Sequence, residues 1–338
     1  MDTKKALYQN FDPIPKLSAY PDLFNAIISG EILVFIGNGV SRLAGVPSWK
    51  ELALKYLDDW WNKKDSDLTY DAYEKLKSME SPLKLISICI NKLGYDRETL
   101  NNKLRDINKP DQNRLKKIYS HIRDFRTGCI TTNYDRFILE ADVSPENKKE
   151  QNFLKSIDMQ KEEEFEEIGF QVGTDIPRNK ILYLHGKSYK IENGEDINDM
   201  DPIFTLRDYL NHYKTDGKGR KFLEKIFKTK MVLFIGLELN EFEIIEHISM
   251  PKGPESKHYI LLGFSDYEKC LIEHYADYYN ALNVEVIPFN KSNKGYKQLE
   301  YILEEWAKDI RNARINKYNE ETWSKIRKID EVNDEKFD

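Results

Sequence analysis

A glycine-rich loop near the start of the chain has residue types suited to holding a phosphate group. Its sequence, GNGVSRLAG, follows the apolar run EILVFI. Gly37 and Gly39 would let the backbone approach a pyrophosphate closely, and Ser41 offers a hydroxyl hydrogen bond. Arg42 stands where a dinucleotide fingerprint needs its third glycine, and no P-loop pattern is present. The loop alone therefore leaves two alternatives, a nucleotide site or a tight turn whose glycines serve geometry only.

Three polar side chains follow two other apolar runs. Asn133 and Asp135 stand in TTNYD, and His185 stands in YLHG. An imidazole titrates near neutral pH and can accept a proton, while an asparagine amide donates and accepts hydrogen bonds without adding charge. Each also has a structural alternative, with Asp135 as a helix cap and His185 as a loop residue bonded to backbone. The other histidines lie within helix or strand patterns and are expected to be structural: His121, His212, His247, His258 and His274.

Apolar runs of strand length, separated by amphipathic segments, would bring these residues together. Continuous apolar runs are typical of parallel strands covered on both faces. Their alternation with helical stripes predicts an α/β fold, a Rossmann-like doubly wound parallel sheet that binds ligands beyond the carboxyl ends of its strands. The expected strands lie at 31–37, at the start of GCITTNYD (128–135), and at 180–186, 230–236, 258–264 and 283–289.

Other segments predict an inserted helical module and two terminal extensions. The insertion has helical patterns throughout, including a segment with Ser81 as its cap, Pro82 in its first turn and Gly94 as its stop. An acidic stretch at 142–179 is expected to be a surface excursion. We divide the chain into an N-terminal arm (1–19), a sheet domain (20–67 and 123–310), the helical insertion (68–122) and a charged C-terminal helix or tail (311–338).

Composition excludes several classes of protein. A content of 40% hydrophobic and 12% aromatic residues excludes global disorder. The net charge of -6 argues against a general attraction to nucleic acid or an anionic membrane. No apolar run approaches the roughly 20 residues that span a bilayer, and no signal-peptide pattern is present, so a cytoplasmic location is expected. Cys89, Cys129 and Cys270 are isolated in the sequence and are expected to be buried thiols.

Taken together, the strand-end segments resemble the sirtuin family, and specifically its bacterial sirtuin-like branch. GNGVSRLAGVPSWKEL is similar to the nucleotide loop of that branch, TTNYD to its second signature, YLHG to its third and LFIGLELNEFEI to its fourth. The similar segments follow the family order over residues 31–289. Two positions depart from the family pattern: Asn38 stands where alanine is commoner, and Glu238 stands where a serine is usual.

The resemblance implies a site that cleaves the bond between nicotinamide and ribose in NAD, through an oxocarbenium-like state. It implies that Asn133 positions the nicotinamide ribose or the attacking water, that Asp135 helps to hold the nicotinamide end, and that His185 is the general base. The expected contacts to NAD are Gly37, Asn38, Gly39, Ser41, Trp49, Thr132, Asp135, Gly236 and Pro288.

The number of cysteines helps to distinguish between the activities that the resemblance allows. Deacylases of the family carry a four-cysteine zinc ribbon, which three scattered cysteines cannot supply, so no metal is expected and water is the expected acceptor. The expected activity is hydrolysis of NAD to nicotinamide and ADP-ribose. Two alternatives stay open: an NAD-dependent protein deacylase or ADP-ribosyl transferase, and a non-enzymatic sensor of NAD or ADP-ribose.

The resemblance also implies a way in which the activity is controlled. Bacterial proteins of this branch are associated with antiphage defence by abortive infection, in which NAD depletion halts the infected cell. Such an activity implies a trigger, either self-assembly into a homo-oligomer or an activating partner such as a HerA-type ATPase. No membrane contact and no direct nucleic-acid binding are expected.

Overall fold

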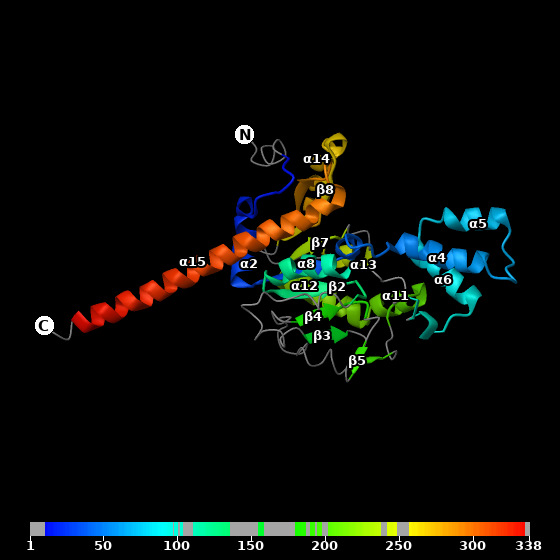
Figure 1. Ribbon diagram of the computed structural model, residues 1–338, viewed down its shortest axis with the longest axis horizontal. Coiled ribbons are helices and arrows are strands. Elements are labelled where there is room, and N and C mark those ends of the chain that lie inside the picture. The colour runs from blue at the N-terminus through cyan, green and yellow to red at the C-terminus, as the bar shows by residue number, and fades with distance from the viewer. Residues whose placement is uncertain are drawn as a thin grey trace.

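In the part of the chain that the structure describes, the centre is a seven-stranded sheet in which every pairing is parallel (Figure 1). The computed structural model describes residues 11–96, 98–100, 102–103, 111–135, 155–158, 180–186, 190–192, 195–197, 202–237, 242–248 and 257–334. The strand order is β3-β4-β2-β1-β7-β8-β9. Without the edge strand β3, the strands follow the order 3-2-1-4-5-6 along the chain, which is the Rossmann-like doubly wound arrangement. The α/β fold expected from the sequence is confirmed.

The strands that the apolar runs predict are present, and the structure adds short ones. β3 lies within the acidic stretch 142–179, for which we expected only a surface excursion. This expectation was wrong because β3 is four residues long, KSID, with a single apolar residue and a place at the sheet edge, so it has no detectable period. A separate antiparallel pair consists of β5 (Lys190–Glu192) and β6 (Glu195–Ile197). The sheet strands are β1 (Ile32–Ile36), β2 (Gly128–Thr131), β3 (Lys155–Asp158), β4 (Lys180–Tyr183), β7 (Met231–Ile235), β8 (His258–Phe264) and β9 (Val284–Asn290).

Helices cover both faces of the sheet, because successive side chains of a strand point to opposite faces. In β1, Val34 and Ile36 belong to one apolar core, and Leu33 and Phe35 belong to another. The first core is shared with α2 (Pro21–Ser29), α8 (Gln112–Arg123) and α15 (Gln298–Asp334). The second core is shared with α11 (Leu206–Tyr213), α12 (Lys218–Thr229), α13 (Phe242–Ile248) and α14 (Leu271–Ala281).

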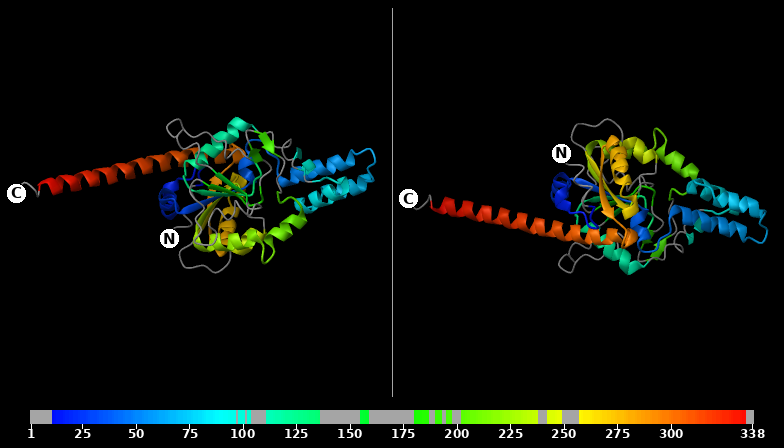
Figure 2. Two further views of the ribbon diagram at one scale, coloured as in Figure 1. Left: turned by 90° about the horizontal axis from the view of Figure 1, so that it is seen from below. Right: turned by 90° about the horizontal axis from the view of Figure 1, so that it is seen from above.

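Three further helices form a module that projects from the carboxyl side of the sheet (Figures 1 and 2). They are α4 (Trp49–Trp61), α5 (Tyr70–Lys77) and α6 (Pro82–Leu93), and α4 and α6 share a core of their own. The caps of α6 are those predicted: Ser81 accepts from the amide of Lys84, and Gly94 ends the helix at φ 67°. α4 thus packs with the module, whereas α8 packs on the sheet. The division of the chain into domains stays a prediction.

The last helix, α15, is 37 residues long and extends well beyond the body of the protein (Figures 1 and 2). Its first part is anchored by buried side chains, among them Ile302, Trp306 and Ile310. Farther along, Arg314 donates hydrogen bonds to backbone carbonyls of α2 and of the segment after α8. Among the described residues, no helix combines the length and the apolar character needed to cross a membrane.

Candidate functional site

The glycine loop after β1 packs against the end of β7 through close backbone contacts. The loop leads directly into α3 (Asn38–Arg42), and the amide of Gly39 donates to the carbonyl of Gly236 at 2.8 Å. A Cβ atom on Gly39 would lie 2.7 Å from that carbonyl oxygen, and one on Gly236 would lie 2.6 Å from the amide nitrogen of Val40. Gly236 also has φ +67°, where glycine carries the least strain. These close contacts are sufficient to explain why Gly39 and Gly236 are glycines. A role of these glycines in binding phosphate stays a prediction.

A buried hydrogen-bond network joins this loop to the TTNYD segment after β2. Ser41 Oγ donates to Asp135 Oδ2 at 2.7 Å, and the amide Nδ2 of Asn133 donates to Ser41 Oγ at 2.9 Å. The hydroxyl of Tyr119, from α8, lies 3.1 Å from Ser41 Oγ and donates to Asp135 Oδ2 at 3.3 Å. Burial, and then the nearby Asp135, raises the pKa of Tyr119 well above its ordinary value, so the phenol stays protonated. The network therefore brings together Ser41, Asn133 and Asp135, as the sequence predicted.

Asn133 is fixed from three sides but retains one open acceptor. Its backbone amide donates to Thr131 Oγ1 at 3.0 Å, and its Nδ2 also donates to the carbonyl of Gly37 at 3.1 Å. The side-chain oxygen Oδ1 is buried and has no hydrogen-bond partner among the described residues. A buried acceptor without a partner costs about 1–3 kcal/mol, so this oxygen is suited to accept from a ligand hydroxyl or a water.

His185 lies in a different environment, under helix α11. Its Nε2 is 2.8 Å from the hydroxyl of Tyr213, and its ring centroid lies 5.5 Å from that of Tyr209 and 6.3 Å from that of His212. Only 2% of the residue is exposed. Burial, with a smaller contribution from His212, lowers the pKa of His185 to about 3. The imidazole is therefore neutral at pH 7, which is the state a general base requires.

Asn133 and His185 occupy equivalent places on adjacent strands but have different neighbours. Thr131 of β2 is paired with Tyr183 of β4, and each of the two site residues stands two positions farther along its strand. The amide of Asn133 faces the glycine loop, whereas the ring of His185 contacts α11. In this conformation the two side chains thus belong to separate hydrogen-bonded groups.

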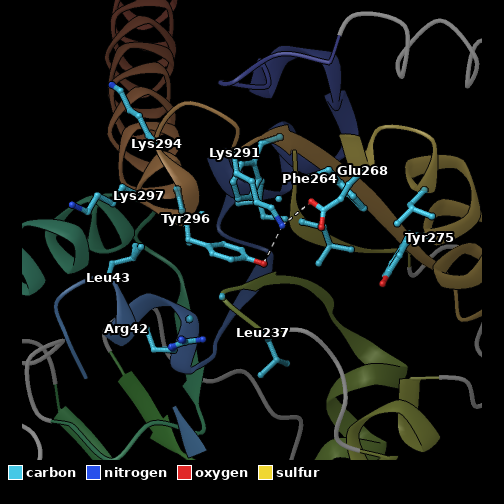
Figure 3. A pocket seen from close by; sticks show the side chains of 18 of the residues that line it. Arg42, Leu43, Leu237, Phe264, Glu268, Tyr275, Lys291, Lys294, Tyr296 and Lys297 are labelled. Carbon is cyan, nitrogen blue, oxygen red and sulfur yellow. Dashed lines mark hydrogen bonds and ion pairs between the residues drawn. The ribbon is translucent and has the colours of Figure 1, made fainter. Parts of the chain in front are cut away.

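A cavity of about 630 Å³ opens beyond the carboxyl ends of β1, β7, β8 and β9 (Figure 3). Its place is next to the point where the strand order reverses, between β1 and β7, and its volume is in the range of nucleotide and drug sites. Gly39 and Gly236 are the predicted site residues that line it. Lys291 points into it, where its Nζ lies 3.0 Å from Glu268 Oε2 and donates to the hydroxyl of Tyr296 at 3.4 Å.

The other residues that we predicted to contact NAD pack or form hydrogen bonds within the protein around the site. Asn38 donates to the carbonyl of Pro47 at 3.1 Å, and Trp49 packs on Tyr134 with ring centroids 5.9 Å apart. Thr132 is buried at the end of β2, and Pro288 is buried within β9. Residues 238–241 of the fourth sirtuin-like segment, including Glu238, lie outside the described residues.

Sequence reasoning missed several residues of the site. Tyr119 stabilises the Ser41–Asp135 network, and Tyr209 and Tyr213 enclose His185. The signal for the second group was the spacing of aromatic side chains in LRDYLNHY, where positions three and four apart share one face of a helix. His212, which we expected to be structural, lies on that same face beside His185.

Among the described residues, no three side chains of histidine, cysteine, aspartate or glutamate are placed to hold a metal ion together. The three cysteines are free thiols. Cys89 and Cys129 are buried, but Cys270 is exposed, contrary to our expectation. It directly precedes α14 at the protein surface, where one apolar residue is readily accommodated.

Residues 127–287 match the family model of the SIR2-like domain. No curated protein matches the chain. The matched range contains Asn133, Asp135, His185 and Gly236. It begins after the glycine loop, but the hydrogen bond from Ser41 to Asp135 connects that loop to the matched range. By this match the chain contains a SIR2-like domain over residues 127–287, and this similarity implies an NAD-related activity.

Proposed function

We propose that this protein is an NAD glycohydrolase. In the reaction, the bond between nicotinamide nitrogen and ribose C1′ breaks, and its electron pair leaves with nicotinamide. A water oxygen then bonds to C1′ and releases one proton, so the products are nicotinamide, ADP-ribose and H⁺. The observation that carries the proposal is the open Oδ1 of Asn133, a buried acceptor that belongs to the SIR2-like range and is held in place beside the glycine loop.

In this proposal Asn133 orients the nicotinamide ribose or the attacking water through Oδ1. Ser41 and Asp135 act as positioning residues, because Asn133 Nδ2 donates to Ser41 Oγ, which in turn donates to Asp135. A ligand hydroxyl or water that donates to Oδ1 would complete the hydrogen bonding of the amide. The rigid network keeps that acceptor aimed at one place, as electrostatic preorganisation requires.

His185 is the proposed general base, and α11 governs its access to substrate. In its buried state the pKa of about 3 makes the imidazole a weak base. Contact with water and substrate would raise this pKa, and the neutral ring could then accept the proton that the water releases. In the described conformation Nε2 is occupied by Tyr213, so turnover requires that this contact open. A movement of α11 relative to the end of β4 would expose the ring to the same ligand that Asn133 contacts.

The cavity beyond β7, β8 and β9 is the proposed place of the adenosine end of NAD. Gly39 and Gly236 line its side nearest the Asn133 network, and tyrosines of α14 line the far side. The pyrophosphate would lie near Arg42, whose side chain is half exposed at the cavity wall. The nicotinamide end would then reach toward Asn133.

The biological role that we propose is depletion of NAD during phage infection. Its support is the resemblance of the strand-end segments to the bacterial sirtuin-like branch. We propose that assembly into a homo-oligomer, or an activating partner such as a HerA-type ATPase, switches the activity on. Cellular NAD should then fall after phage infection in cells that express the protein, and should not fall in cells that express the Asn133→Ala variant.

The direct test is an NAD-consumption assay with product identification by HPLC. The purified full chain is assayed over a range of protein concentrations, with and without an acyl-lysine peptide. We expect nicotinamide and ADP-ribose without peptide, and loss of both in Asn133→Ala and His185→Ala. His274→Ala, which changes an exposed histidine of α14, serves as the control. Turnover that depends on the peptide would instead indicate a deacylase.

One observation favours a second candidate, binding of NAD or ADP-ribose without turnover. His185 is buried and bonded to Tyr213, which is the arrangement expected of a structural histidine. Calorimetry that shows ADP-ribose binding, together with no nicotinamide release at any concentration, would support this sensor function.

A further inference from the structure

The cavity beyond β7, β8 and β9 is rich in positive charge, although the chain as a whole carries a net charge of -6. Its described lining contains a single carboxylate, that of Glu268. It contains four cationic side chains: Arg42, Lys291, Lys294 and Lys297. This excess of cations favours a ligand with more than one anionic group.

Figure 3 shows the cations at three parts of the wall, namely Arg42, then Lys291, and then Lys294 with Lys297, whose side chains point away from Lys291. Arg42 lies at the end of α3, beside the glycine loop. The three lysines follow β9, and Lys294 directly precedes the short helix η4 (Gly295–Lys297), of which Lys297 is the last residue. Lys294 Nζ lies 3.5 Å from the centroid of the Tyr301 ring, which holds this side chain at the rim. A ligand that spans the cavity would therefore meet positive charge at both ends.

The carboxylate of Glu268 is already engaged by the protein. Its Oε2 accepts from the backbone amide of Ser265 at 2.8 Å and from the Ser265 hydroxyl at 2.5 Å, and it pairs with Lys291 Nζ at 3.0 Å. In dinucleotide sites that select NAD, an acidic side chain accepts from the 2′-hydroxyl of the adenosine ribose and repels a phosphate there. Here the one acid in the described lining, Glu268, is paired with Lys291, and only 17% of the lysine side chain is exposed.

From this arrangement we infer that the cavity prefers an adenosine with a 2′-phosphate in addition to its 5′-pyrophosphate. The dinucleotide of this chemistry is NADP. The 5′-pyrophosphate would face Arg42 and the glycine loop, and the 2′-phosphate would face Lys291, with Lys294 and Lys297 adding positive charge at the rim. The inference rests on the proposed function for the identity of the dinucleotide, but the cavity and its charges are independent of the chemistry at Asn133.

The test uses calorimetry on the full chain with three fragments that cannot be hydrolysed at a nicotinamide bond. These are adenosine 2′,5′-bisphosphate, adenosine 3′,5′-bisphosphate and AMP. We expect the 2′,5′-bisphosphate to bind about tenfold more tightly than AMP, the ratio that one added charged hydrogen bond gives. Equal binding of AMP, or equal or tighter binding of the 3′,5′-bisphosphate, would overturn the inference.

Lysine variants test which side chains cause the preference for the 2′-phosphate. Lys291→Gln, which keeps a hydrogen-bond donor for Glu268, and the double variant Lys294→Gln, Lys297→Gln should each reduce the preference for the 2′-phosphate and leave AMP binding unchanged. Lys317→Gln, on the exposed part of α15, has the same change of charge and should keep the wild-type preference. A preference unaltered in both cavity variants would show that these lysines do not bind the phosphate.

Failure of this inference can be distinguished from failure of the proposed function. A protein that prefers the 2′,5′-bisphosphate but releases no nicotinamide from NAD or NADP retains this inference and loses the glycohydrolase assignment. A protein that releases nicotinamide from NAD but does not distinguish the fragments retains the glycohydrolase assignment and loses this inference.

Discussion

The hydroxyl of Ser41 donates to the carboxylate of Asp135 at 2.7 Å, across 94 residues of sequence. This buried bond connects the loop after β1 to the segment after β2, and it places Asn133 between them. Ser41 lies before the range that matches the SIR2-like domain, and Asp135 lies within it. The site is therefore built from residues outside and inside the matched range. The consequences of this arrangement are testable.

Ser41→Ala should destabilise the protein and impair NAD cleavage. The variant removes a donor from the buried carboxylate of Asp135 and an acceptor from Asn133, at an expected cost of about 1–3 kcal/mol in the free energy of unfolding. Urea denaturation measures this cost, and HPLC measures nicotinamide release. Ser78→Ala, at an exposed helix end, is the matched control. Equal unfolding free energies for the two variants would contradict the role of the network.

Gly236→Ala should be more damaging than Gly94→Ala. Both glycines have φ +67°, so both variants meet the left-handed strain of about 1–2 kcal/mol. A Cβ atom on Gly94 has no atom within 4 Å, whereas one on Gly236 would lie 2.6 Å from the amide nitrogen of Val40. The difference between their unfolding free energies, measured in urea, isolates the contact between the two loops. If the two variants were equally stable, that contact would not matter.

Stability should fall as the pH is lowered below about 6.5, the ordinary pKa of histidine. Burial holds the pKa of His185 at about 3 and that of His212 at about 4 in the folded protein. Between those values and the ordinary pKa, the unfolded chain takes up protons that the folded chain does not. The free energy of unfolding therefore decreases toward low pH, by at most about 1.4 kcal/mol per pH unit for each histidine.

Unfolding in urea at pH 5 and pH 7.5 measures this dependence. His185→Phe should flatten it, because the variant removes one of the buried histidines whose pKa is lowered. His274→Phe, on the exposed side of α14, should leave it as in the wild type. A wild-type slope retained in His185→Phe would contradict the burial of a neutral imidazole.

Tyr213→Phe should increase the rate of NAD cleavage several-fold while lowering stability by about 1 kcal/mol, the net worth of one hydrogen bond. The variant removes the Tyr213 hydroxyl from Nε2 of His185 and weakens the contact between α11 and the end of β4. The kcat for NAD and the rate of imidazole modification by diethyl pyrocarbonate should rise together. Tyr278→Phe, at an exposed tyrosine, is the control. A lower kcat with unchanged modification would mean that Tyr213 positions His185 for catalysis.

Local sequence patterns were sufficient for most of the architecture. The apolar run at β1 predicted a central strand, because a strand covered on both faces must be apolar at every position. Ser81 as the cap and Gly94 as the stop predicted both ends of α6. β3 was missed, because four residues with one apolar side chain have no measurable period.

The sequence by itself determined the parallel sheet and the strand ends at which Asn133, Asp135 and His185 would stand, because these depend on short-range periodicity. The tertiary structure decided which residues meet there. Tyr119 contacts Asp135, and Tyr213 contacts His185, because helices α8 and α11 pack against the strand ends. Lys291 faces Glu268 across a cavity that exists only between folded loops. Such contacts depend on how elements pack in space, and no local pattern of residues encodes them.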